Sequence, residues 1–168
     1  IDLYLVSYYS SSSTAVDGIA ATGNTVTGNV AGEEGGGINS FLWGEGSFSP
    51  GVLRVDGNTL RANTATRAGG GAAVGTRESG APPAPPESAS ATEHWFRNNL
   101  VLSNVAHKDD GTGVGAGAFV YLESADTAGL PTVGIDFATL ASNEADAGGG
   151  GIEAEAYTGT AGAAYLDV

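Results

Sequence analysis

The fold of this chain is decided by a short phrase that first reads Val26-Thr27-Gly28-Asn29-Val30-Ala31. It consists of an aliphatic residue, two variable residues, an asparagine, one more residue and an alanine. The phrase recurs three times, and its asparagines are 34, 41 and 39 residues apart. A repeat at this period indicates a solenoid, in which each copy is one structural unit. The later copies are Leu60-Arg61-Ala62-Asn63-Thr64-Ala65, Val101-Leu102-Ser103-Asn104-Val105-Ala106 and Leu140-Ala141-Ser142-Asn143-Glu144-Ala145.

Each copy of the phrase is flanked by two further features. Upstream, an alternating apolar stretch ends in a turn pair, as in Leu53-Arg54-Val55-Asp56-Gly57-Asn58. Downstream, a glycine run leads to a small or aliphatic residue, as in Gly35-Gly36-Gly37-Ile38. Alternation with period 2 predicts β-strands, and nothing in the unit has helical spacing. We therefore expect three short strands per unit, separated by Gly-Asn, by Asn and by the glycine run.

Units this short cannot bury an apolar face alone, so they are expected to stack as the coils of a solenoid. Equivalent strands of successive coils then pair at about 4.8 Å, and their inward residues form continuous columns. One predicted column contains Ile19, Leu53, His94 and Val133, and the other contains Val26, Leu60, Val101 and Leu140.

The asparagines of the phrase are expected at the same corner of every coil. Asparagine tolerates the left-handed backbone of a tight corner, and glycine tolerates it better. Stacked asparagine side chains can also hydrogen-bond to the copies above and below them. The predicted structural ladder consists of Asn29, Asn63, Asn104 and Asn143.

The phrase followed by Gly-Gly-Gly-Ile resembles the repeats of right-handed parallel β-helix proteins, in particular the passengers of autotransporters and of polymorphic outer-membrane proteins. The match spans residues 18 to 152, with Val or Leu in place of the family's usual phenylalanine. The resemblance implies a single-stranded right-handed parallel β-helix of about four coils, with three strands per coil and long loops on one side. Such helices serve as adhesins, stalks, sheath components and scaffolds of polysaccharide-degrading enzymes, so the fold alone does not define the function.

The chain is expected to form one all-β domain. It divides into an N-terminal strand segment (1–17), four repeats (18–152) and a C-terminal strand segment (153–168). It contains no cysteine, so disulfides and thiolate chemistry are excluded. No stretch approaches the roughly 18 apolar residues of a transmembrane helix.

The charge of the chain is strongly acidic, with 19 acidic and 6 basic residues and a net charge of −13. Nucleic acid is therefore not expected as a partner, because phosphate binding needs basic clusters. Together with 28 glycines, this composition favours an extracellular or cell-surface protein. Acidic, lysine-poor surfaces are also typical of proteins from high-salt habitats, where screening weakens self-repulsion.

Three insertions, at residues 39–51, 75–93 and 122–132, interrupt the coils and are expected to emerge on one side. The first holds Phe41, Trp43 and Phe48. Loops on a rigid scaffold often carry binding sites, so these aromatic residues are a candidate ligand loop for a carbohydrate or a partner. The alternative is that they fold back to cover the flank of the coil.

Candidate catalytic and metal-binding residues are few. Asp56, Arg97 and Asp136 are expected to form an outward column, for which a stacked ion-pair ladder is a sufficient explanation. Asp109 and Asp110 lie in a glycine-rich turn and are weak candidates for calcium, without a complete ligand set. We predict no catalytic residue, no enzymatic activity and no cofactor.

Both ends of the chain are rich in strand-forming residues and show no cap. An open coil edge is a template for another strand, so the last coil is expected to receive the first strand of a second copy and to build a filament. The competing explanation is a piece of a longer β-helix. The expected function is an extracellular, self-assembling structural protein; the alternatives are a polysaccharide-binding or polysaccharide-cleaving β-helix and an adhesin passenger fragment. The residues predicted for assembly are Leu3, Tyr4, Leu5, Tyr8, Tyr165 and Leu166.

Overall fold

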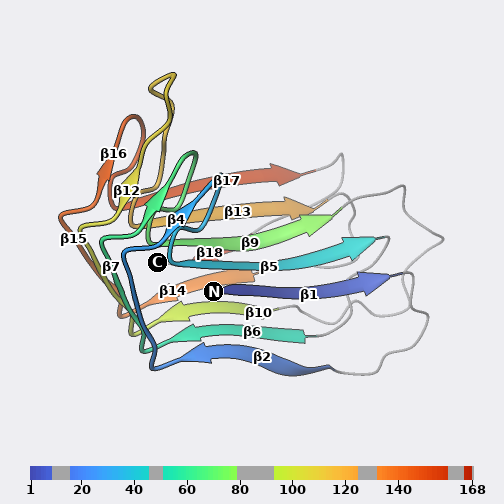
Figure 1. Cartoon of the computed structure of the whole chain (residues 1–168). Coiled ribbons are helices and arrows are strands. Elements are labelled where there is room, and N and C mark those ends of the chain that lie inside the picture. The colour runs from blue at the N-terminus through green and yellow to red at the C-terminus, as the bar shows by residue number, and fades with distance from the viewer. Residues whose placement is uncertain (9–15, 46–50, 79–92, 125–131, 159–164, 168) are drawn as a thin grey trace.

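The computed structural model describes residues 1–8, 16–45, 51–78, 93–124, 132–158 and 165–167 (Figure 1). Within these ranges every regular element is a β-strand and no helix is present. The strands form four sheets, in which all pairings are parallel. The chain is therefore a parallel β-solenoid, as the sequence predicts.

Two long sheets, which we call A and B, form opposite walls of the solenoid (Figure 1). Sheet A contains, in order, β1 (Asp2–Tyr8), β5 (Ile38–Glu45), β9 (Ala72–Glu78), β13 (Ala118–Ser124) and β17 (Ile152–Thr158). Sheet B contains β2 (Val16–Thr22), β6 (Gly51–Asp56), β10 (Glu93–Arg97), β14 (Thr132–Asp136) and β18 (Tyr165–Asp167).

Two short sheets, C and D, connect these walls at one side (Figure 1). Sheet C contains β3 (Thr25–Thr27), β7 (Thr59–Arg61), β11 (Leu100–Leu102) and β15 (Thr139–Ala141). Sheet D contains β4 (Val30–Ala31), β8 (Thr64–Ala65), β12 (Val105–Ala106) and β16 (Glu144–Ala145). The chain passes through B, C, D and A in turn, which defines repeat 1 (β2–β5), repeat 2 (β6–β9), repeat 3 (β10–β13) and repeat 4 (β14–β17).

Each described repeat thus has four strands, whereas three per coil are expected from the sequence. The additional strand follows the glycine run, as in β5, β9 and β13, whose later residues are predicted as insertions. The repeated phrase itself divides at its asparagine, as expected, and the residue before the asparagine forms the corner. There the backbone has a positive φ in every repeat, and a residue in this conformation ends a strand. The strand that follows has only two residues, too few to show an alternation. The corner residues are Gly28 (φ 68°), Ala62 (52°), Ser103 (53°) and Ser142 (55°).

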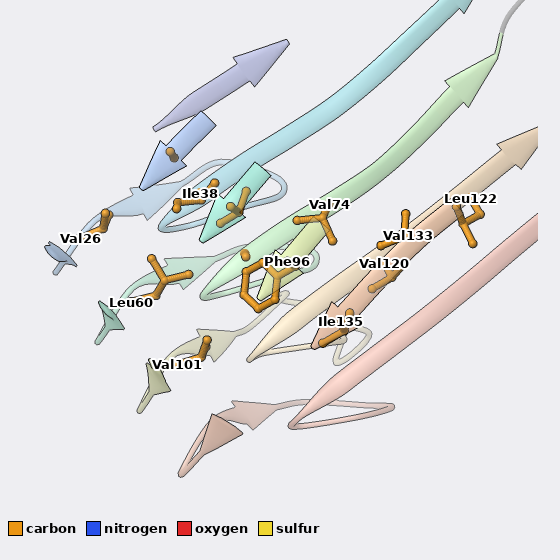
Figure 2. Close-up of a cluster of buried hydrophobic side chains, with 13 residues drawn as sticks. Val26, Ile38, Leu60, Val74, Phe96, Val101, Val120, Leu122, Val133 and Ile135 are labelled. Carbon is orange, nitrogen blue, oxygen red and sulfur yellow. The ribbon is translucent and has the colours of Figure 1, made fainter. Parts of the chain in front are cut away.

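The inward residues of sheets A, B and C form one apolar core (Figure 2). Both predicted columns are present, because Leu53 pairs in register with Ile19 and His94, and Leu60 with Val26 and Val101. Each fully buried aliphatic or aromatic side chain contributes about 1.5–3 kcal/mol to stability. The fully buried members include Ile38, Val55, Leu60, Phe96, Val101 and Val120.

The glycine runs allow adjacent repeats to stack closely where sheet D leads into sheet A. A Cβ atom on Gly37 would lie 2.5 Å from the carbonyl oxygen of Gly71, and one on Gly71 would lie 2.5 Å from that of Gly117. Any side chain here would separate the backbones. The runs are therefore a packing requirement of the stack.

The three predicted insertions begin later than the sequence indicates. Strand β5 continues to Glu45, β9 to Glu78 and β13 to Ser124, so the first part of each insertion is strand. Residues 46–50, 79–92 and 125–131 lie outside the described residues, and the last residue of each insertion begins the next strand.

Candidate functional site

The asparagines of the repeated phrase stack in one column. Asn63 Oδ1 accepts hydrogen bonds from the backbone N–H of Asn29 (3.1 Å) and from its Nδ2 (3.0 Å). Asn104 Oδ1 accepts the equivalent two hydrogen bonds from the N–H and Nδ2 of Asn63, at 2.9 and 3.0 Å. Asn143 Oδ1 accepts them from the N–H and Nδ2 of Asn104, at 3.0 Å each. Asn63 and Asn104 are fully buried, so these bonds replace the water that both side chains lose.

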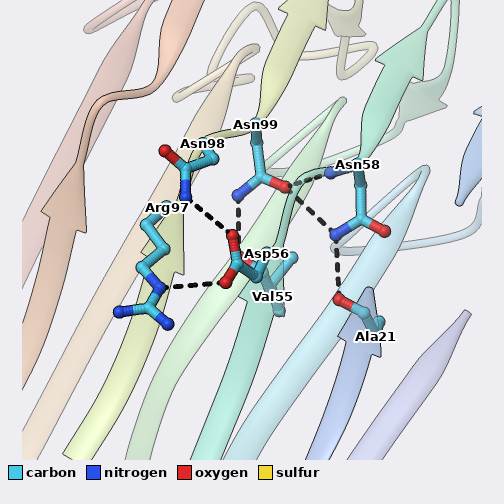
Figure 3. A network of polar contacts seen from close by, with 7 residues as sticks. All are labelled: Ala21, Val55, Asp56, Asn58, Arg97, Asn98 and Asn99. Atoms are coloured by element: carbon cyan, nitrogen blue, oxygen red, sulfur yellow. Dashed lines mark hydrogen bonds and ion pairs between the residues drawn. The ribbon is translucent and has the colours of Figure 1, made fainter. Parts of the chain in front are cut away.

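A second asparagine column follows the corner between sheets B and C (Figure 3). Asn58 Oδ1 accepts from the N–H and Nδ2 of Asn24, at 2.9 and 3.0 Å, and Asn99 Oδ1 accepts from Asn58 at the same distances. The column stops in repeat 4, where the equivalent residue is Ala138. The turn pairs in the sequence predict only corners here, and the recurrence of asparagine in three repeats is the signal that reveals the column.

Both columns have a direction. In each, Oδ1 accepts from the preceding repeat, while the N–H and Nδ2 donate to the following one. The same Nδ2 also donates to a backbone carbonyl of the preceding repeat, as from Asn63 to Val26 (3.0 Å). One end of a stack of repeats therefore presents acceptors and the other presents donors, so repeats fit together in one orientation only.

The outer face of sheet B carries the predicted column of charged residues (Figure 3). Arg97 Nε donates to Asp56 Oδ2 at 3.0 Å, and Asn98 Nδ2 donates to Asp56 Oδ1 at 2.9 Å. The Asn98 hydrogen bond, with help from Arg97, lowers the pKa of Asp56 below its usual value against the opposing effect of burial. Asp136 is the register neighbour of Arg97 in repeat 4. An exposed ion pair of this kind contributes about 1 kcal/mol or less.

Trp95 lies on the same outer face, one strand from a glycine. Its six-membered ring occupies the space beside Gly134 in the next repeat, where a Cβ atom would be 2.2 Å from Cζ3 and 2.4 Å from Cε3. The indole therefore packs against the backbone of β14. Arg54 is its register neighbour on the other side and is exposed.

A buried polar pair joins the two long walls inside the core. His94 Nε2 lies 3.0 Å from Ser40 Oγ, and His94 Nδ1 lies 3.4 Å from the carbonyl oxygen of Gly75. Since a carbonyl only accepts, Nδ1 is the protonated nitrogen and Nε2 accepts from the serine hydroxyl. Burial lowers the pKa of His94 to about 4, so the ring is neutral at pH 7.

The turn around Asp109 and Asp110 is held together by its own side chains. Asp110 Oδ2 pairs with Lys108 Nζ at 2.7 Å, and Asp110 Oδ1 accepts from Thr112. The hydrogen bond to Lys108, followed by that to Thr112, lowers the pKa of Asp110 to about 2. Nearby, His107 Nδ1 bonds to Asp146 at 2.8 Å. The described residues contain no group of three or more His, Cys, Asp or Glu side chains that could hold a metal ion.

Among the aromatic residues of the candidate ligand loop, Phe41 has a described side chain. Phe41 lies in strand β5 and is only 2% exposed, in a second apolar cluster on the outer face of sheet A with Phe119, Ala68 and Ala73. Its ring is therefore not available for stacking on a ligand. Trp43 also belongs to β5, but its side chain and the whole of Phe48 lie outside the described residues.

The residues predicted for assembly lie in strands that already pair within the chain. Leu3, Tyr4, Leu5 and Tyr8 belong to β1, which pairs with β5, and Leu3 is partly buried against the core. Tyr165 and Leu166 belong to β18, which pairs with β14. The first strand is therefore not free to leave without loss, and only its outer edge is open to a second copy. The side chains of these residues other than Leu3 lie outside the described part.

The chain was compared with known families, proteins and structures. No family model matches the chain, and neither a curated protein nor a solved structure does. Among the described residues there is no helix long and apolar enough to span a membrane.

Proposed function

We propose that this chain is an extracellular structural protein, a filament or surface-fibre subunit in which β-helices stack head to tail. The polarity of the asparagine columns carries the proposal. The Oδ1 atoms of Asn24 and Asn29 occupy the acceptor positions at one end of the stack, and the N–H of Asn143 occupies the donor position at the other. A second copy in the same orientation continues the polarity of the columns, so that its acceptor end faces the donor end of the first copy. Such a heterologous contact does not close, so it propagates.

The right-handed winding and the cell-surface location belong to the same proposal. Their support is the resemblance of the repeats to autotransporter and polymorphic outer-membrane-protein passengers. The acidic composition is compatible with a solvated outer surface. Rigidity in such a fibre comes from the hydrogen-bonded stack, because the chain has no cysteine.

The numbers of strands define how two copies meet. Sheets A and B have five strands each, and sheets C and D have four. If β1 of an incoming copy pairs with β17, its β2 falls beside β18, and sheets C and D each lack one strand at the junction. A junction without this gap requires β1 of one copy and β18 of the other to detach. The first arrangement retains every strand pair seen in the chain, so we favour it. In it the ends of the asparagine columns face one another across the missing strands of sheets C and D, whereas the second arrangement joins Asn143 directly to Asn29 of the next copy.

Electron microscopy with helical reconstruction tests the proposal. We expect unbranched fibres with a subunit repeat of about 24 Å, which is five strand spacings of about 4.8 Å. High salt should promote them, because it screens the repulsion between copies of net charge −13. A repeat of about 19 Å would indicate the junction with detached strands. Discrete particles at all salt and protein concentrations would contradict the proposal, and deletion of residues 1–9 is the control that should abolish the 24 Å repeat.

A saccharide-binding face on sheet B is the alternative, and Trp95 favours it. The indole is held against the backbone at Gly134, and the neighbouring Arg54, Asp56 and Arg97 supply hydrogen-bond donors and acceptors. An aromatic face beside such groups suits a pyranose ring, which is apolar on its faces and polar at its edge.

Binding of defined oligosaccharides tests this alternative. Neutral and acidic oligosaccharides are titrated against the chain by calorimetry, and each mixture is assayed for new reducing or unsaturated ends. Binding that Trp95→Leu removes and that Trp95→Phe, which keeps an aromatic ring, largely retains would support the saccharide face. New chain ends would establish cleavage, and absence of heat with every oligosaccharide would exclude the alternative.

A further inference from the structure

Phe137 is an outlier in both conformation and exposure. Its φ is 51°, and its side chain is 84% exposed. The equivalent corners of the other repeats carry Gly23, Gly57 and Asn98, residue types that adopt this conformation readily. A bulky residue with positive φ is strained, and an exposed ring gains little from its own fold. Strain of this kind points to a contact outside the fold.

The surface next to Phe137 is the outer face of sheet C, and it lacks acidic residues. The outward positions are the first and third residues of its three-residue strands. They hold four threonines, Leu100, Leu102, Ala141 and Arg61, in a chain with 19 acidic residues. Leu100 is 37% exposed. Depletion of charge around exposed apolar residues is typical of the centre of a protein interface.

The pattern of side chains on this face is complementary to itself. A two-fold axis along β11 would place repeat 2 of one copy opposite repeat 4 of the other. Phe137 then meets Gly57 of the second copy, and Arg61 meets Ala141. Thr59 faces Thr139 in the same way, and Leu100 and Leu102 face their own equivalents. Phe137 and Arg61 thus lie opposite small residues, and the two leucines pack against their own equivalents.

We propose that the outer face of sheet C is an isologous interface with a second copy of this chain. The two sheets pack face to face with their strands aligned, and Phe137 of each copy fills the space over Gly57 of the other. Arg61 also approaches Glu144 of the second copy, since Glu144 follows Ala141 on the adjacent sheet D. This lateral pairing uses a different surface from the head-to-tail junction and does not depend on it.

The interface is small, so the isolated pair is weak. Three opposed strands about 4.8 Å apart give a face well below the roughly 800 Å² per partner of a stable complex. Along a fibre the same contact would repeat at every subunit, and repetition raises the combined affinity.

Sedimentation of the full chain over a concentration series tests the proposal. The wild type should dimerise reversibly, and Phe137→Gly and Phe137→Ala should both weaken the dimer by roughly tenfold or more. Only Phe137→Gly removes the strain, so it alone should raise Tm, by about 2 °C. Leu100→Thr introduces the residue of the other three repeats and should also weaken the dimer. Val30→Thr, on sheet D, is the matched control and should leave it unchanged.

Three results would overturn the proposal. These are a monomer at every concentration, a dimer insensitive to both Phe137 variants, and a fall in Tm for Phe137→Gly, which would mean that the ring is held by its own chain. Electron microscopy of Phe137→Gly separates the two assemblies. Single fibres with the wild-type axial repeat would mean that only the lateral contact has been lost. Side-by-side pairs of fibres would contradict the sheet C interface without affecting the head-to-tail proposal.

Discussion

Replacement of Asn63 by leucine is expected to lower the free energy of unfolding by about 4 kcal/mol, at about 1 kcal/mol for each hydrogen bond lost. The side chain makes four such bonds, two with Asn29, one with Val26 and one with Asn104. Leucine has a similar volume, so the loss reflects hydrogen bonding rather than a cavity. The site is also closely packed, since a Cβ on Gly37 would lie 2.9 Å from Asn63 Nδ2.

Asn29→Leu provides the matched control for this prediction. Asn29 is exposed at the first repeat, and its side chain donates only to Thr27 and to Asn63. Water can replace these bonds, so the same substitution should cost less than about 1 kcal/mol there. Denaturant unfolding of both variants gives the comparison. Equal losses at the two positions would show that stacking of asparagines is not what stabilises the corner.

The asparagine column illustrates what the sequence can predict in a solenoid. The spacing of Asn29, Asn63, Asn104 and Asn143 predicts that they share a corner, because equivalent residues of a repeat occupy equivalent positions. Partners along the stack are thus accessible from the period alone. The full strand after the glycine run is not, because its later residues differ from copy to copy.

Partners across the solenoid are much harder to predict. The inward position of His94 follows from its column, but Ser40 lies on the opposite wall, 54 residues away. The repeat predicts which residues stack in neighbouring coils. It does not predict which residues of sheet A lie opposite which residues of sheet B. The serine therefore could not be selected from the sequence.

The outer face of sheet A shows a second limit. Alternation from Ile38 places Phe41 on the outside, which leaves a ligand contact and coverage by the chain itself as alternatives. In the structure the segments after sheet D bridge over this face, with Ala68 pairing to Glu34 and Val114. These segments cover the outward residues of sheet A, which form a second apolar cluster with them. No pattern in the sequence marks that coverage.

Acidification from pH 7 to pH 4 is expected to lower the free energy of unfolding by about 3 kcal/mol through His94 alone, at about 1.4 kcal/mol per pKa unit. Burial lowers the pKa of this histidine from 6.5 to about 4. Between these values the unfolded chain binds a proton and the folded chain does not, so stability falls as the pH falls through this window. Unfolding by denaturant at half-unit steps of pH measures the slope.

The other titrating groups can be separated from His94. Hydrogen bonds lower the pKa values of Asp56 and Asp146 below 3.8, so their contributions are lost at lower pH than that of His94. The hydrogen bond to Asp146 raises the pKa of His107 above 6.5, so its contribution is present at low pH and is lost as the pH rises through the folded pKa. The effect of His107 thus has the opposite sign, and His107→Gln removes it.

His94→Leu should abolish the loss of stability between pH 6.5 and pH 4. Leucine is the residue at the same column position in repeat 2, where Leu53 is fully buried. The variant leaves Ser40 without its partner in the core, so its stability at pH 7 should fall, and Ser40→Ala in the same chain should recover part of that fall. A slope retained in His94→Leu would assign the acid sensitivity to groups other than His94. A slope that disappears would mean that the link between the two long walls is itself the acid-sensitive element of the solenoid.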